Sequence, residues 1–109
     1  MIEELDEEGL PCPPPPILAG TEARELKIVN RKGLHARATA KFVQCVDRFD
    51  VEISVTRCGE TVGGDSIMGI LTLGAGLGST ITVAARGRQA REALDALATL
   101  VADRFGEEE

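Results

Sequence analysis

Residues 51–56 alternate strictly between apolar and polar side chains. The apolar positions are Val51, Ile53 and Val55, and the residues between them are polar. A period of two is typical of a strand with one face in a core and the other in water. A sheet of such strands needs a second layer over its apolar face, so the segment predicts a layered domain.

Other segments of the chain show the same period or the helical one. Ser66 precedes one helical segment as an N-cap, and Gly74 follows it as a stop signal. The order of elements is β-α-β-β-α-β-α, which predicts an α+β sandwich with three helices on one face of a four-stranded antiparallel sheet. The expected strands are residues 26–29, 51–56, 61–62 and 81–85, and the expected helices are residues 36–49, 66–74 and 88–105.

The negative charge is concentrated at the two ends of the chain. Residues 1–24 hold six acidic side chains, one basic side chain and a proline run at 13–16. Such a segment cannot bury enough apolar surface to fold, so we expect a disordered tail over residues 1–24. The predicted domain spans 25–106, and 107–109 form an acidic end.

Composition narrows the possible classes of protein. No apolar run could span a bilayer and no secretory signal precedes the domain, so we expect a cytoplasmic protein without membrane insertion. The three cysteines are odd in number and lack zinc-ligand spacing, which argues against a disulfide framework and a metal site. Aromatic residues make up 3% of the chain, which disfavours nucleic-acid binding. We expect a monomer.

His35, the only histidine, lies where a predicted strand gives way to a helix. The first N–H groups of a helix lack partners within it, and the helix dipole adds positive charge there, so this end favours anions. Arg37 can bring a planar set of donors to the same anion. These residues predict a phosphate site with imidazole as the nucleophile. The simpler alternative is a histidine that caps or packs.

Basic side chains extend from this position along the predicted helix. Arg37, Lys41, Gln44 and Arg48 share one helical stripe, called here the basic strip. A solvated helix face would look similar. Because the strip starts at the predicted phosphate site, we favour an acidic protein partner that contacts Lys41 and Arg48.

Two motifs together resemble a known family. Gly33-Leu34-His35-Ala36-Arg37, followed by Asp65-Ser66-Ile67-Met68-Gly69-Ile70 and Leu73-Gly74, is similar to HPr, the histidine phosphocarrier of the bacterial phosphotransferase system. The resemblance covers about residues 25–105. It implies a carrier rather than an enzyme, without a cofactor. His35 would accept phosphate on Nδ1 from enzyme I, Arg37 would stabilise it, and an enzyme IIA domain would receive it.

Ser66 has a structural and a functional interpretation. As an N-cap it stabilises a helix by about 1 kcal/mol. The resemblance implies that it is also a regulatory site for HPr kinase/phosphorylase. The resemblance further implies that Ile67, Met68 and Leu71 are partly exposed and bind partners, so a phosphate at Ser66 would put charge into that interface.

The sequence departs from the family pattern in three places. Ala38 stands where many relatives have proline, the acidic Asp65 precedes Ser66, and the tail has no usual counterpart. A different class of function is a regulatory binding module that signals through Ser66 and uses His35 little. Sugar transport and a nitrogen-related regulatory branch both remain open.

Overall fold

A computed structural model describes residues 20–107, which contain one four-stranded antiparallel sheet with the order β1-β4-β2-β3. The central strands pair with Val55 opposite Val83, and the outer strand β1 pairs with Leu26 opposite Ile81. Apolar residues of neighbouring strands therefore share one face of the sheet. The strands are β1 (Glu22–Lys27), β2 (Glu52–Arg57), β3 (Glu60–Gly63) and β4 (Thr80–Arg86).

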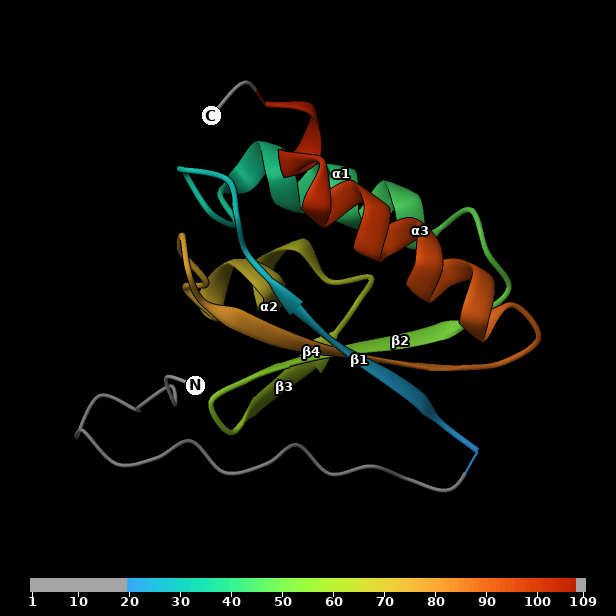
Figure 1. Ribbon diagram of the computed structural model, residues 1–109. Coiled ribbons are helices and arrows are strands. Elements are labelled where there is room, and N and C mark those ends of the chain that lie inside the picture. Colours follow the sequence, from blue (N-terminus) through green and yellow to red (C-terminus); the bar gives the residue numbers. More distant parts are fainter. Residues whose placement is uncertain (1–19, 108–109) are drawn as a thin grey trace.

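Three helices cover this apolar face, as Figure 1 shows. The chain runs β-α-β-β-α-β-α, so the predicted α+β sandwich is confirmed. A short 3-10 turn after the last helix leads back to the start of the first helix (Figure 1). The helical elements are α1 (Ala36–Val46), α2 (Ile67–Thr72), α3 (Ala90–Ala102) and the 3-10 turn η1 (Arg104–Gly106).

The core lies between the sheet and the helices. Burial alternates as predicted through the middle of β2 and along β4, because Val55 and Val83 are fully buried while Ser54 and Thr82 are not. At the two ends of the predicted segment 51–56 the alternation fails, since Thr56 is also buried and Val51 precedes β2 and is half-buried. The buried residues of α1 and α3 recur with the helical period, so each helix has one inner face. The buried apolar residues of these elements are Ile53, Val55, Ile81, Val83, Ala85, Ala38, Phe42, Cys45, Val46, Ala93, Leu94, Leu97 and Val101.

The first strand begins earlier than predicted. Glu22 pairs with Ala85 and Arg24 with Val83, so residues 22–24, assigned above to the tail, belong to the sheet. Backbone pairing with β4 overrides their polar composition, since β1 is an edge strand on which Glu22 stays exposed while Ala23 and Arg24 are half-buried. Residues 1–19, 108 and 109 lie outside the described residues, so the expectation of disorder for that part of the tail stays a prediction.

Two helices end earlier than their apolar periodicity suggested. α1 ends at Val46. The N–H groups of residues 48 and 49 then donate to the carbonyls of Cys45 and Val46, three residues earlier, which forms a turn rather than a further turn of α-helix. α3 ends at Ala102, and Phe105 has a φ of 55°, which cannot continue a right-handed helix. Phe105 is nevertheless 1% exposed. Because this buried side chain falls on the apolar period of α3, the sequence pattern extended the predicted helix to Phe105, although the backbone has already left the helix there.

Residues 57–60 form a hairpin turn between β2 and β3, with Arg57 paired to Glu60 across it. Within residues 20–107, no helix has the length and apolar character needed to cross a bilayer.

Candidate phosphate-accepting site

His35 is the N-cap residue of α1. Its backbone is extended, with φ −75° and ψ 178°, and its carbonyl accepts the N–H of Thr39 at 2.9 Å. Its side chain makes no capping hydrogen bond. The imidazole is therefore free of a capping role, and the first N–H groups of α1 remain available to an anion beside it.

The loop before His35 packs tightly against the loop after α2. Leu34 donates its N–H to the carbonyl of Ala75 at 2.8 Å. Gly33 has a φ of +65°, and a Cβ there would lie 2.5 Å from the Ala75 oxygen and 2.6 Å from the Cα of Gly76. Only glycine combines this backbone angle with so close an approach. This contact fixes where the backbone enters α1 relative to the loop after α2, and thereby fixes the position of His35.

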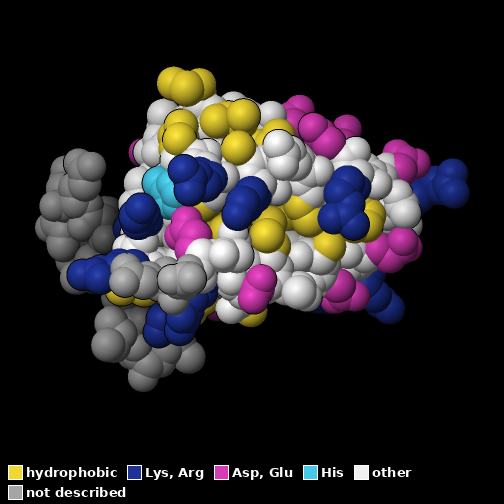
Figure 2. All heavy atoms as spheres, turned by 90° about the horizontal axis from the view of Figure 1, so that it is seen from above, with side chains coloured by type: hydrophobic (Ala, Val, Ile, Leu, Met, Phe, Trp, Pro, Cys, Tyr) yellow, Lys and Arg dark blue, Asp and Glu magenta, His cyan; other side chains and the backbone are white. Residues whose placement is uncertain are grey.

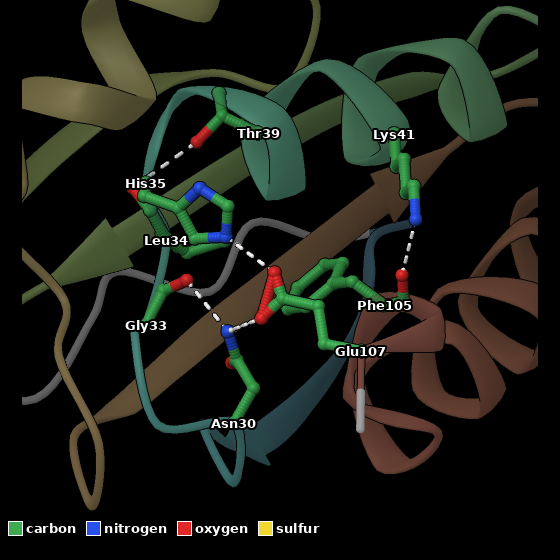
Figure 3. Close-up of polar contacts among 8 residues, drawn as sticks. All are labelled: Asn30, Gly33, Leu34, His35, Thr39, Lys41, Phe105 and Glu107. Atoms are coloured by element: carbon green, nitrogen blue, oxygen red, sulfur yellow. Dashed lines mark hydrogen bonds and ion pairs between the residues drawn. The ribbon is translucent and has the colours of Figure 1, made fainter. Parts of the chain in front are cut away.

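Glu107, from the far end of the chain, binds the imidazole (Figure 3). Its Oε2 lies 2.5 Å from Nε2 of His35, and its Oε1 accepts from Nδ2 of Asn30 at 2.9 Å. Asn30 is fully buried and also donates to the carbonyl of Gly33 at 2.8 Å. Nδ1 of His35 points away from Glu107, toward the start of α1 (Figure 3). The carboxylate thus binds one ring nitrogen and makes no contact with the other.

These contacts shift the titration of Glu107. The hydrogen bond from Asn30, and then that from His35, lower the pKa of this carboxyl below its ordinary value, while burial opposes them. Lys32 adds a smaller favourable charge. The carboxyl is therefore ionised at neutral pH.

The lowered pKa of Glu107 predicts a pH-dependent contribution to stability. Because the folded-state pKa lies below the unfolded one, the contribution is complete above about pH 4.3 and disappears as the pH falls through the folded-state value. Wild type should therefore unfold at higher urea than Glu107→Gln at pH 7, and the gap should close on acidification. A gap that stays constant down to strongly acidic pH would contradict the assigned contacts.

The basic side chains of the basic strip are not all exposed and free to bind a partner. Arg37 and Arg48 are exposed, but Lys41 is half-buried and donates to the carbonyl of Phe105 at 2.5 Å. The Arg48 guanidinium lies 5.7 Å from the ring centre of Phe49. Figure 2 shows basic side chains leading away from the histidine. Lys41 thus fastens the C-terminal segment to α1, a role that the charge pattern did not indicate.

Ser66 caps α2 as predicted. Its Oγ accepts the N–H of Gly69 at 3.0 Å, and the side chain is exposed. Ile67 is 42% and Met68 72% exposed, whereas Leu71 is half-buried. Hydrophobic side chains gather next to the histidine in Figure 2. The structure therefore places an exposed apolar surface near His35.

Sequence reasoning missed Asn30 and Glu107. A polar residue directly after an apolar strand was a usable signal for Asn30, because a buried amide needs partners. Glu107 gave no such signal among three consecutive glutamates. It is corrected here from part of an acidic end to a partner of His35. The described residues contain no group of three or more His, Cys, Asp or Glu side chains arranged to hold a metal ion.

Comparison with known proteins decides the family. Residues 22–103 match the family model described as the PTS HPr component phosphorylation site, where PTS is the phosphotransferase system. The chain belongs to the HPr family. Both motifs that suggested HPr, around His35 and Ser66, lie inside the matched region. Glu107 lies outside it.

Curated relatives and solved structures agree with this assignment. The phosphocarrier protein HPr of Cupriavidus necator is 46% identical over 86 residues, which cover 79% of this chain and 97% of the relative. The phosphocarrier protein NPr of Shewanella violacea is 39% identical, covering 77% and 92%. The crystal structure of HPr-C-His from Thermoanaerobacter tengcongensis has a TM-score of 0.78 at 39% identity, covering 81% and 99%. HPr proteins are carriers rather than catalysts.

Proposed function

We propose that this protein accepts a phosphoryl group on Nδ1 of His35 from phosphorylated enzyme I and passes it to an enzyme IIA protein. The observation that carries the proposal is the position of the imidazole. It caps α1 without a capping bond, its Nε2 is held by Glu107, and its Nδ1 points toward the first turn of the helix.

The chemistry needs a nucleophile that is also a leaving group. The Nδ1 lone pair forms a bond to phosphorus while the bond from phosphorus to the donor breaks, and its electron pair leaves with the donor. In the reverse sense, imidazole departs well once its other nitrogen is protonated. The free N–H groups of α1 and the exposed Arg37 stabilise the phosphoryl oxygens.

Partner binding is proposed for the surface around the histidine. Exposed Ile67 and Met68, with half-buried Leu71, supply the apolar part. Arg48 and the basic strip attract an acidic partner by long-range charge. Lys41 contributes less than predicted from the sequence, because its ammonium already binds the Phe105 carbonyl.

The proposal is tested by incubating the protein with enzyme I and phosphoenolpyruvate. A phosphate that is labile in acid and stable in base should appear, because the phosphorus–nitrogen bond of phosphohistidine breaks readily after protonation. The labelled protein should then lose phosphate to an enzyme IIA domain. Absence of label from the wild type would refute the carrier function.

Ser66 carries a second, regulatory proposal. Its exposed hydroxyl lies at the edge of the apolar surface and could be modified by HPr kinase/phosphorylase. A binding module that signals through Ser66 alone remains the alternative. Purified enzyme IIA proteins of the sugar-transport and nitrogen-related branches, offered the labelled carrier in parallel, distinguish the two pathways.

Charge at Ser66 should weaken transfer from enzyme I. Ser66→Asp places a carboxylate within the apolar surface, which must lose its hydration when a partner binds, and we expect phosphorylation to slow by about tenfold. The measurement is the initial rate of labelling at limiting carrier.

Ser66→Ala is the matched control for this variant. It removes the capping oxygen, at a cost of about 1 kcal/mol, without adding charge. Its labelling rate should stay near that of wild type. Equal labelling rates for Ser66→Asp and wild type would count against a role of the apolar surface in binding enzyme I.

A further inference from the structure

The contact between Glu107 and His35 remains unexplained by the phosphate site. Glu107 lies on the Nε2 side of the ring, opposite the nitrogen proposed to react, and outside the residues that match the family model. Both of its carboxylate oxygens have partners among buried or half-buried groups.

We propose that Glu107 is a positioning residue, whose carboxylate keeps the proton of His35 on Nε2 and so keeps Nδ1 unprotonated for the phosphoryl group. The inference rests on the proposed function. It adds a residue from the C-terminal segment to the machinery around the histidine.

The hydrogen-bonding inventory supports this assignment. An ionised carboxylate can only accept, so the proton in the 2.5 Å contact belongs to Nε2. A neutral imidazole carries one proton, and its second nitrogen then has a free lone pair. Glu107 therefore selects one of two tautomers that differ little in energy in water.

The carboxylate is held in place before any partner arrives. Asn30 binds its second oxygen at 2.9 Å, and Lys41 binds the carbonyl of Phe105 two residues earlier. Phe105 is buried against the core. Three independent anchors thus limit the freedom of the segment, which lowers the entropy cost of orienting the ring.

The same contact acts during transfer. When the Nδ1 lone pair bonds to phosphorus and the donor leaves with its electron pair, the ring, still protonated at Nε2, gains positive charge. The Glu107 carboxylate faces that charge directly. It should therefore stabilise the protonated phosphohistidine, which is the form that releases phosphate.

Other charged groups lie on the segments next to His35 in the chain or packed against its loop, and of these only Asp103 is changed in a variant tested below. α2 carries no ionisable side chain, and the loop over residues 74–78 carries none. The charged groups on the remaining neighbouring segments are Arg31 and Lys32 before His35, Arg37 and Lys41 on α1, and Asp103 and Arg104 ahead of Glu107.

The first test measures the tautomer without any phosphoryl transfer. Nitrogen-15 NMR of the imidazole, recorded on the alkaline plateau of its chemical shifts, separates the two neutral forms. Wild type and Asp103→Asn should show the proton on Nε2. Glu107→Gln can also donate a hydrogen bond and should give a mixture. An unchanged tautomer in Glu107→Gln would overturn the proposal.

The second test follows the loss of phosphate from labelled protein across pH. In wild type the rate of phosphate loss should rise as the pH falls. In Glu107→Gln this rise should move to lower pH by about half a unit to one unit, because the partly exposed carboxylate no longer stabilises the protonated ring. Asp103→Asn, which changes a charge four residues away, should keep the wild-type profile. Identical pH profiles for wild type and Glu107→Gln would refute the claim that Glu107 stabilises the protonated phosphohistidine.

The two tests separate this inference from the carrier function. If the wild type takes no label, the carrier function fails, yet the tautomer measurement still decides the role of Glu107. If the wild type is labelled and the tautomer does not depend on Glu107, the carrier stands and the positioning role is refuted.

Discussion

Replacing His35 with alanine is expected to abolish the acid-labile phosphate label. The chain has no second histidine, so no other imidazole can take over. The fold should remain, because the His35 side chain is 27% exposed, makes no capping bond and gives up only its contact with Glu107. The measurements are labelling with enzyme I and phosphoenolpyruvate, and thermal unfolding of the same sample.

Arg37→Ala is the control that separates loss of the acceptor from loss of an accessory group. Arg37 is exposed and only stabilises the phosphoryl oxygens in our proposal, so its removal should slow labelling without eliminating it. Arg37→Lys should recover part of the rate, because a single ammonium cannot match the planar guanidinium. Label of wild-type stoichiometry on His35→Ala would show a different acceptor.

Local periodicity accounts for the part of the fold that the sequence predicted. The alternation around Ile53 and Val55 depends only on which side of a strand each residue occupies. Ser66 was identifiable as a cap because its oxygen binds an N–H three residues away. Each of these features depends on interactions between residues close together in the chain, so it can be predicted from the sequence alone.

The partner of His35 could not be predicted in this way. Glu107 and His35 are 72 residues apart, and only the turn of the backbone at Phe105 brings the two together. Phe105 continues the apolar stripe of α3, and Gly106, which follows it with a φ of 76°, signals only that the helix ends and not where the chain goes next. Lys41 was misjudged for the same reason, because periodicity identifies a helix face but not the segment that folds across it.

The glycine before His35 should be the most sensitive backbone position of the site. In Gly33→Ala the positive φ alone costs about 1 to 2 kcal/mol, and the clash with Ala75 and Gly76 adds a similar amount. We expect a total loss of about 3 kcal/mol in the free energy of unfolding, measured by urea denaturation. Displacement of the loop should also slow labelling, because Leu34 and His35 follow directly.

Gly74→Ala separates the two contributions. Gly74 has a nearly identical φ of +62°, but nothing lies within 4 Å of the position that its Cβ would take. Its substitution should cost only the conformational part, about 1 to 2 kcal/mol, and leave labelling unchanged. If both variants lost the same stability, the close approach of Gly33 to Ala75 would not contribute. A larger loss at Gly33, accompanied by slower labelling, would show that this loop contact places the imidazole.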